Sequence, residues 1–336
     1  MQTHRGRPGE RMADRMRAVV QDRYGPPEEA LRIAEVDRPI PRDDQVLVEV
    51  CATTVTRGDA FRVTGDAYRF TRLITGLRRP RQPITGTEFA GRIFEVGAAV
   101  TEYRVGDEVF GAASATNATF IAVEAAGSIA AKPQSLSFEE ATAVPDGSLL
   151  AMTCLRPAFP LANKRVLVYG AGGSIGTAAV QLLVHHFGAT VTAVCDTDAV
   201  EVVRSLGAHE VLDRLRTDFT MTDTAYDVIF DAVGKHSFRR CRRSLEPHGV
   251  YVTVDLGYGY HVPFLALATR LGRGRRAALG IGQYRAEDLR TIVGLVEAGA
   301  YRPVIDRRYS FDDAVEAVRY VASGRKTGNV VLQVRD

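Results

Sequence analysis

The first part of the chain alternates apolar and polar residues over short stretches that turn residues interrupt. A two-residue period of this kind is typical of half-buried β-strands. A glycine and an aspartate at positions 106 and 107 separate two apolar stretches, which predicts a tight turn. We therefore expect a β-rich domain with few helices from residue 16 to about residue 130. The clearest alternating stretches are 17–21, 45–50 and 92–96.

The pattern changes near residue 142, where short apolar stretches begin to alternate with segments of helical period. Helices are expected between these strands, most clearly over 177–184, which contains neither proline nor glycine. Regular alternation of strand and helix predicts a parallel, doubly wound sheet. The expected strands are 165–169, 190–195, 210–212, 226–230 and 250–254.

The last part of the chain again mixes the two patterns. We expect a helix from 285 to 296, a strand at 303–305 and a final strand at 329–334. Ser310 and Asp313 have the spacing of a capping box, which predicts a helix start. A length of 336 residues exceeds what one hydrophobic core usually holds, so two domains are predicted.

Composition and the cysteines narrow the class of protein. The chain is 46% hydrophobic and 25% charged, as in globular proteins. No apolar run approaches the roughly 18 residues of a membrane helix, so we expect no membrane partner. The arginine-rich segment 1–15 lacks the apolar core of a secretory signal. We expect this segment to be a disordered tail, or the true start codon to be at Met12 or Met16. Four widely spaced cysteines fit neither a disulfide framework nor a metal knuckle, which favours a cytoplasmic location.

Arginine clusters raise the question of a nucleic-acid partner. The alternative is that these arginines are solvated faces and loop edges. With 43 basic and 40 acidic residues the net charge is only +3, and no RNA-binding motif is present, so no nucleic-acid partner is expected. His185 and His186 are adjacent in a predicted helix and point about 100° apart, so they cannot easily share a metal ion. The clusters lie at 78–81, 239–243 and 270–276.

A glycine-rich stretch joins the strand at 165–169 to the helix that follows. Glycines let a backbone approach a pyrophosphate, and the amides at a helix N-terminus bind the anion. Asp196 lies about 20 residues after the last glycine, at the end of the next strand, where an acidic residue binds ribose hydroxyls. The alternative is a merely structural turn. We predict dinucleotide binding, with the pyrophosphate held by backbone amides of Gly173, Ser174, Ile175 and Gly176.

Several motifs in a fixed order resemble one family. The glycine stretch reads Gly170-Ala-Gly-Gly-Ser-Ile-Gly176, with alanine in the first glycine position of the usual fingerprint. Together with the other motifs, it resembles the zinc-free quinone oxidoreductase-like branch of the medium-chain dehydrogenase/reductases. The resemblance covers 16–334. The other motifs are Gly86-Thr-Glu-Phe-Ala-Gly91, Arg104-Val-Gly-Asp-Glu-Val109, Val203-Arg-Ser-Leu-Gly-Ala208, Asp231-Ala-Val-Gly234, Pro303-Val-Ile-Asp306 and Gly328-Asn-Val-Val331.

The resemblance implies a fold of class α/β plus β. A GroES-like β-rich catalytic domain would comprise 16–142 and 275–336, and a Rossmann dinucleotide-binding domain would be inserted at 143–274. The active site of such proteins lies in the cleft between the two domains. A homodimer is a further family expectation.

Three positions decide whether this cleft holds zinc. Thr56, Thr87 and Asp146 stand where zinc-dependent relatives have cysteine, histidine and cysteine. A catalytic zinc needs three protein ligands and an open position, and only Asp146 could serve. The four-cysteine structural lobe is missing as well. We therefore expect no catalytic zinc, with weak metal binding by Asp146 and Glu88 as the open alternative.

The resemblance implies hydride transfer from NAD(P)H to a quinone or conjugated enone, an acceptor that does not require a Lewis acid. Some polar groups of the family are absent: Phe61 lacks a hydroxyl, and Leu150 stands where a hydroxyl is expected near the nicotinamide. We predict that Asp146 and Thr56, which replaces the usual asparagine, are the catalytic residues. Alternatively, Asp146 only caps the helix that follows it.

Cofactor contacts are also implied by the resemblance. Arg57 would bind the pyrophosphate, unless it is simply an exposed arginine. Val233 is a further expected cofactor contact. The segment 255–260 follows the C-terminal end of a parallel strand, where ligands bind, so Leu256 and Gly257 are expected in the nicotinamide wall.

Two acidic residues favour NADH over NADPH. Asp196 and Asp198 would repel a 2′-phosphate, whereas Arg214 stands where relatives often have a tyrosine that contacts this phosphate. The preference for NADH is therefore modest.

Two alternatives to a general quinone or enone reductase remain open. One is a reductase or dehydratase that acts on a single biosynthetic intermediate. The other is a nucleotide-binding protein without turnover, such as a redox-sensing or RNA-binding relative, which the missing polar groups would suit.

Overall fold

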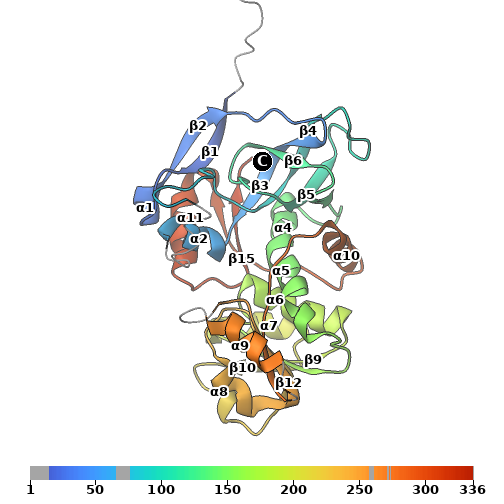
Figure 1. Ribbon diagram of the computed structural model, residues 1–336. Helices are drawn as coiled ribbons and strands as arrows, with labels where there is room; N and C mark the ends of the chain where they lie inside the picture. The colour runs from blue at the N-terminus through green and yellow to red at the C-terminus, as the bar shows by residue number, and fades with distance from the viewer. Residues whose placement is uncertain (1–14, 66–75, 257–260, 271, 273, 336) are drawn as a thin grey trace, which may run out of the picture.

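The computed structural model describes residues 15–65, 76–256, 261–270, 272 and 274–335. The chain forms a β-rich domain and a second domain below it in the view of Figure 1. Of the predicted tail, residues 1–14 lie outside the described residues. Arg15, which we assigned to the tail, is instead the first residue of strand β1 (Arg15–Gln21).

The β-rich domain contains a two-stranded sheet, β1 with β2 (Leu31–Asp37), and a seven-stranded sheet. The larger sheet has the order β14-β15-β3-β4-β5-β7, with β6 paired to β3. Because β15 pairs antiparallel with β3, the C-terminal segment completes a sheet that the first third of the chain begins. Its strands are β3 (Gln45–Val55), β4 (Glu88–Val96), β5 (Glu108–Ala112), β6 (Phe120–Glu124), β7 (Ser128–Ala131), β14 (Ile305–Ser310) and β15 (Asn329–Gln333).

The second domain is a six-stranded parallel sheet of order β10-β9-β8-β11-β12-β13. This is the strand order of the Rossmann fold, which confirms the predicted class. Val166, Leu167 and Val168 are fully buried, as expected for a strand covered on both faces. The strands are β8 (Arg165–Tyr169), β9 (Thr190–Cys195), β10 (Glu210–Asp213), β11 (Tyr226–Asp231), β12 (Leu245–Thr253) and β13 (Arg276–Leu279).

Helices pack around these sheets and link the domains. In α10, Leu289, Ile292 and Val296 are buried at helical spacing and join the same apolar core as α5 and α6. The helices are α1 (Pro27–Ala30), α2 (Arg57–Thr64), α4 (Phe138–Thr142), α5 (Pro145–Leu155), α6 (Ser174–Gln181), α7 (Val200–Ser205), α8 (Phe238–Cys241), α9 (His261–Arg270), α10 (Ala286–Glu297) and α11 (Ala314–Ala322).

Three details differ from the sequence-based expectations. β13 pairs with β12, so the chain returns to the β-rich domain after residue 280 rather than at 275. The strand expected at 303–305 begins only at Ile305. Ser310 does precede a helical turn, but its hydroxyl bonds the Asp313 carboxylate at 2.7 Å instead of a backbone amide.

Two expectations about composition can be compared with the structure. All four cysteines are buried free thiols. Within the described ranges, no helix has both the length and the apolar character to cross a membrane.

Candidate active site

The glycine-rich loop ends at the N-terminus of α6. Gly173 occupies the cap position without a side-chain cap, and the first helical hydrogen bond runs from the Thr177 amide to the Gly173 carbonyl at 2.8 Å. The amides of Ser174, Ile175 and Gly176 are therefore the first-turn donors that have no carbonyl partner within the helix. An anion at the start of α6 would accept hydrogen bonds from these amides. The Gly173 amide, which we also predicted to hold the pyrophosphate, instead donates to the Gly170 carbonyl at 3.1 Å.

Two glycines of this loop differ in what surrounds them. A Cβ atom at Gly176 would lie 2.1 Å from the Gly170 carbonyl oxygen, so close packing within the loop requires glycine there. A Cβ atom at Gly173 would meet its nearest neighbour, the same oxygen, only at 3.7 Å. A side chain at Gly173 would therefore meet little of the protein, whereas one at Gly176 would clash with the loop backbone.

The C-terminal segment of the β-rich domain contacts this loop. The Gly328 amide donates to the Gly172 carbonyl at 2.7 Å, and Gly328 forms an isolated parallel bridge with Gly173. Lys326, two residues earlier, donates through Nζ to the Gly328 carbonyl and is partly buried. The two domains therefore meet at the predicted pyrophosphate loop.

Asp146 lies beside the same loop and does not cap a helix. Helix α5 has Val144 at its N-cap position, with no side-chain cap, and Asp146 is the second helical residue. Its Oδ2 atom accepts a hydrogen bond from the Ser174 hydroxyl at 3.0 Å, and the Tyr284 hydroxyl lies 3.5 Å from Oδ1. The interpretation of Asp146 as only a cap is therefore wrong, because its side chain joins α5 to the start of α6.

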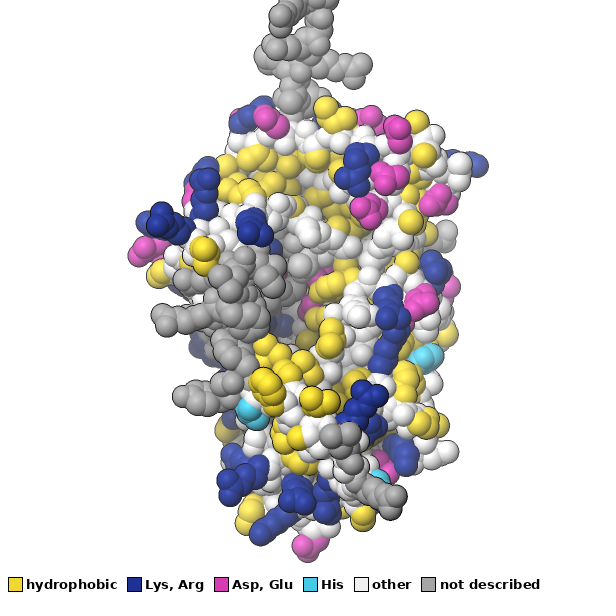
Figure 2. Space-filling model, viewed as in Figure 1, with side chains coloured by type: hydrophobic (Ala, Val, Ile, Leu, Met, Phe, Trp, Pro, Cys, Tyr) yellow, Lys and Arg dark blue, Asp and Glu magenta, His cyan; other side chains and the backbone are white. Residues whose placement is uncertain are grey.

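The pKa of the Asp146 carboxyl group is set by burial and by its charged and polar neighbours. The side chain is only 7% exposed, and burial raises its pKa, with the charge of Asp59 acting in the same direction. Lys326 and the Ser174 and Tyr284 hydroxyls oppose this rise in pKa. Asp146 is a buried acid between the domains, and Figure 2 shows acidic side chains in the hollow between them.

Thr56 uses most of its hydrogen-bonding capacity at the start of α2. Its hydroxyl donates to Asp59 Oδ2 at 2.8 Å and accepts from the Asp59 amide at 3.0 Å, which completes a capping box. A hydroxyl has one hydrogen and two lone pairs, so one acceptor site is left. Thr56 therefore cannot also donate to an oxygen that gains negative charge during a reaction.

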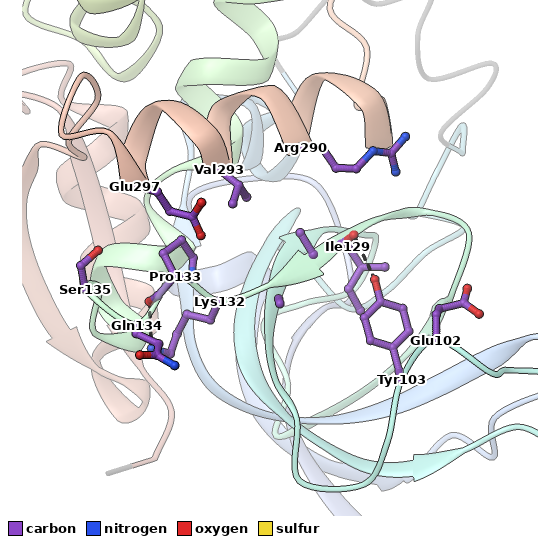
Figure 3. A pocket seen from close by; sticks show the side chains of 12 residues that line it. Glu102, Tyr103, Ile129, Lys132, Pro133, Gln134, Ser135, Arg290, Val293 and Glu297 are labelled. Carbon is purple, nitrogen blue, oxygen red and sulfur yellow. Dashed lines mark hydrogen bonds between the residues drawn. The ribbon is translucent and has the colours of Figure 1, made fainter.

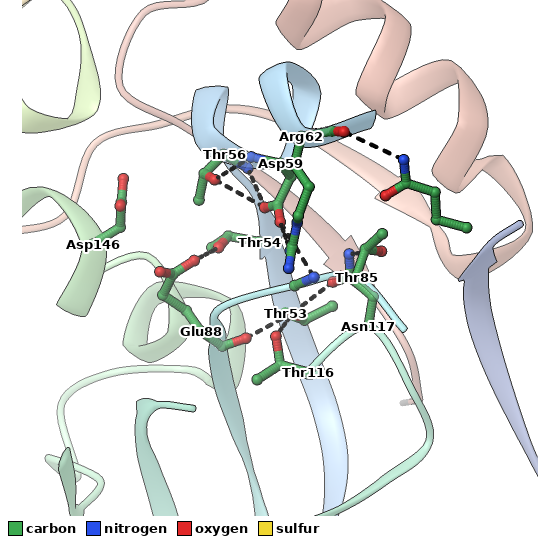
Figure 4. A network of polar contacts seen from close by, with 12 residues as sticks. Thr53, Thr54, Thr56, Asp59, Arg62, Thr85, Glu88, Thr116, Asn117 and Asp146 are labelled. Atoms are coloured by element: carbon green, nitrogen blue, oxygen red, sulfur yellow. Dashed lines mark hydrogen bonds and ion pairs between the residues drawn. The ribbon is translucent and has the colours of Figure 1, made fainter. Parts of the chain in front are cut away.

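A polar network around Glu88 was not predicted from the sequence. Glu88 is fully buried at the start of β4 and accepts a hydrogen bond from the Thr54 hydroxyl (Figure 4). Asp59 accepts from the Arg62 guanidinium at 2.8 Å and from the Gly86 amide at 3.2 Å. The sequence pairs Glu88 with Asp146 only as an alternative weak metal site, and the hydrogen bonds around Glu88 become apparent only in the fold.

The predicted ribose ligand is engaged in an ion pair. Asp196 follows β9, and its Oδ1 atom lies 2.5 Å from Nε of Arg214, with both side chains about half exposed. Asp196, which favours NADH, therefore contacts Arg214, which would favour NADPH. Asp196 directly follows the C-terminal end of β9, and its role in ribose binding stays a prediction.

The other predicted cofactor contacts have the following positions. The Arg57 guanidinium stacks on Phe61 at 5.0 Å from the ring centroid. Val233 packs against Gly170, where a Cβ atom would lie 2.6 Å from Val233 Cγ1. Leu256 is partly buried after β12. Gly257, like Tyr258 and Tyr260 of the same segment, lies outside the described residues.

The donor set of the cleft does not suit zinc. Thr56 and Thr87 offer hydroxyls, and Asp146 is the only one of the three positions with a side chain that zinc commonly takes. Among the residues that the structure describes, no group of three or more His, Cys, Asp or Glu side chains is arranged to hold a metal ion.

A separate cavity of about 780 Å³ lies between β7 and α10, away from these residues (Figure 3). None of the predicted site residues lines it. Its wall includes Tyr103, Lys132, Arg290 and Glu297.

Comparison with known proteins identifies the family. Residues 42–154 match the family model described as an alcohol dehydrogenase GroES-like domain, and 206–332 match that of a zinc-binding dehydrogenase. The 2-methylene-furan-3-one reductase of Solanum lycopersicum is 30% identical over 87% of this chain and 72% of its own length. This chain belongs to the quinone oxidoreductase-like branch of the medium-chain dehydrogenase/reductases. It is an enzyme of the oxidoreductase class, in a family that depends on NAD(P)H.

Other members of the family agree with this assignment. The chloroplastic NADPH-dependent alkenal/one oxidoreductase of Arabidopsis thaliana is 27% identical over 94% of this chain and 79% of its own length. The solved structure of the quinone oxidoreductase from Coxiella burnetii superposes with a TM-score of 0.84 at 26% identity, over 96% of this chain and 100% of that one.

Proposed function

We propose that this enzyme uses NAD(P)H to reduce a quinone or the conjugated C=C bond of an enone, without zinc. The carrying observation is the hydrogen bond between buried Asp146 and Ser174, which places an acid at the predicted pyrophosphate loop. The names of the tomato and Arabidopsis relatives and of the Coxiella structure support this substrate class.

The residues of the cleft take separate roles in this proposal. The amides of Ser174, Ile175 and Gly176 hold the pyrophosphate, with Arg57 and Val233 as further contacts. Leu256 forms part of the nicotinamide wall. When bound, the reduced nicotinamide supplies a hydride. Helix α9 has exposed apolar side chains, among them Phe264 and Leu267. Figure 2 shows an apolar patch over this helix, next to the hollow, which suits an apolar acceptor.

Asp146 completes the reduction in this proposal. An acceptor that takes up a hydride at one atom needs a proton at another, and a buried carboxylic acid can donate it. The Thr56 hydroxyl already donates to Asp59, so Thr56 helps to hold the start of α2 in place and does not donate a hydrogen bond to the substrate. The test is to incubate the protein with NADH or NADPH and a panel of quinones and enones, following the loss of nicotinamide absorbance. Turnover supports the proposal; tight cofactor binding without turnover of any acceptor would favour the non-catalytic alternative.

We expect tighter binding of NADH than of NADPH. Asp196 would accept hydrogen bonds from ribose hydroxyls and repel a 2′-phosphate, while Arg214 is occupied by Asp196. In Asp196→Ser, the freed Arg214 should shift the ratio of dissociation constants toward NADPH by about tenfold, which corresponds to about 1.4 kcal/mol. The exposed Asp198→Ser variant is the control, with a smaller shift. Tighter NADPH binding by the unaltered protein would refute the preference.

We also expect no stoichiometric zinc in the purified enzyme. Two of the three positions that correspond to zinc ligands are threonines, whose neutral hydroxyls are poor zinc donors. Elemental analysis should find well below one zinc per chain, and chelation should leave activity unchanged. One tightly held zinc per chain, lost together with activity on chelation, would overturn the zinc-free proposal.

A further inference from the structure

Five charged side chains gather where α2, β4 and α5 approach the C-terminal segment. Asp59, Glu88 and Asp146 are acidic and at least 93% buried, with exposed fractions of 1%, 0% and 7%. Two cations accompany them. Arg62 pairs with Asp59 at 2.8 Å, and Lys326 has Asp146 as its strongest favourable charge. Arg57 and Asp306 also act on the charge of Lys326, but they are one cation and one anion and leave this balance unchanged. Three carboxyl groups with two cations leave one carboxyl group without a charge partner, and an unpaired buried carboxylate is costly.

Hydrogen bonding identifies Glu88 as that group. Asp59 accepts from two backbone amides, a hydroxyl and Arg62. Asp146 has the Ser174 hydroxyl and the charge of Lys326. Glu88 has the Thr54 hydroxyl on Oε2, whereas its buried Oε1 atom has no hydrogen-bond partner within the described part of the chain. Of the three carboxyl groups, Glu88 therefore has the fewest neighbours that stabilise a negative charge.

The surroundings of Glu88 agree with a neutral side chain. Burial raises its pKa well above the usual range, and the charges of Asp146 and Asp59 add to this, while the Thr54 and Thr87 hydroxyls oppose it. The titratable groups that face it are Asp146 on α5, Asp59 on α2, Tyr284 after β13 and Lys326 before β15. In Figure 4 the Glu88 carboxyl group points toward Asp146.

We propose that Glu88 is the proton store of the cleft: it is a neutral acid in the protein without ligands, and its proton passes to the Asp146 carboxylate, which delivers it to the substrate. The neutral state of Glu88 is a property of the chain itself, while the transfer rests on the proposed function.

The proton balance of the proposal is as follows. The bound cofactor would supply the hydride for one carbon of the C=C bond and would be the group that is oxidised. The O–H bond of Glu88 breaks as the Asp146 carboxylate takes its proton. That proton then leaves Asp146 as a C–H bond forms at the neighbouring carbon, and Glu88 regains a proton from solvent. No direct hydrogen bond joins the two carboxyl groups, and a bridging water would find partners in Glu88 Oε1 and Thr87 Oγ1, both buried and unpartnered among the described residues. Glu88 thus acts through Asp146 and is a positioning residue.

Infrared spectroscopy of the protein without cofactor tests the first half of the proposal. At neutral pH we expect the carbonyl stretch of a neutral carboxylic acid, shifted in D₂O. The band should be lost in Glu88→Gln and kept in Glu95→Gln, an exposed glutamate on the same strand. Absence of the band from the unaltered protein, or its persistence in Glu88→Gln, would overturn the proposal whether or not any substrate is turned over.

The pH dependence of turnover tests the second half. As pH rises through the pKa of Glu88, Glu88 loses its proton. Turnover of the unaltered enzyme should therefore fall over the same pH range in which the infrared band fades. This comparison needs no variant. In Glu88→Gln, turnover at the optimum should fall about tenfold, that alkaline decline should disappear, and cofactor affinity should be unchanged. An unaltered rate with the same alkaline decline in Glu88→Gln, or a band that fades in a different pH range from turnover, would show that Glu88 does not supply the proton.

Discussion

Replacing Asp146 with asparagine is expected to lower turnover by about a hundredfold or more, the usual contribution of a general acid. Asparagine has nearly the same shape and can still accept the hydrogen bond from the Ser174 hydroxyl, which is 3.0 Å from Oδ2 of Asp146. It has no acidic proton to give at neutral pH. Melting temperature and NADH affinity should therefore change little while the rate of NADH oxidation with a quinone or enone falls.

Two further variants separate catalysis from structure at this position. Asp223→Asn alters an exposed aspartate of the same domain and should keep full activity. Ser174→Ala removes the hydrogen-bond donor to Asp146 but leaves the acid, so it should lower turnover less than Asp146→Asn does. If Asp146→Asn retains near-full activity, Asp146 is not the proton donor and the catalytic proposal fails.

Alanine at Gly173 and at Gly176 should have opposite effects on binding and stability. At Gly173 the added methyl group has room within the protein, with its nearest neighbour at 3.7 Å, so stability should hold. The methyl group would stand where the pyrophosphate approaches, so the dissociation constant for NADH should rise more than tenfold, which is about 1.4 kcal/mol or more.

At Gly176 the methyl group would lie 2.1 Å from the Gly170 carbonyl oxygen and 2.6 Å from Ala171 Cα. Both are backbone atoms, so the loop itself must shift, and overpacking of this kind costs about 1–3 kcal/mol. Denaturant unfolding and fluorescence titration with NADH measure both quantities for the two variants. Wild-type NADH affinity in Gly173→Ala would show that the cofactor does not approach this glycine.

The glycine loop shows how far sequence reasoning reached at the site. A buried apolar strand, glycines and a helix without breakers are local features, and each acts over a few residues. The structure places the amides of Ser174, Ile175 and Gly176 at the start of α6 accordingly. The role of Asp146 was not accessible in this way. Its local sequence favoured a helix cap, but its partner Ser174 lies 28 residues further along the chain.

The domain boundary shows a related limit. The strand β13 is only four residues long, and its membership in the Rossmann sheet depends on pairing with β12 rather than on its own pattern. The sequence placed the return to the β-rich domain at 275, before this strand. Short strands carry little periodicity, so their sheet is decided by their neighbours.

The sequence alone determined the two-domain α/β plus β architecture, the family and the dinucleotide loop. Hydrophobic period and glycine spacing involve residues that are close together in the chain, so they can be identified without the fold. Only the tertiary structure decided which charged side chains lie close to one another. Asp196 meets Arg214, and Glu88 comes close to Asp146 from a different domain. The protonation of a carboxyl group depends on burial and on charges a few ångströms away in space. Residues that are distant in the chain supply both, so the acid chemistry of the cleft emerges only from the fold.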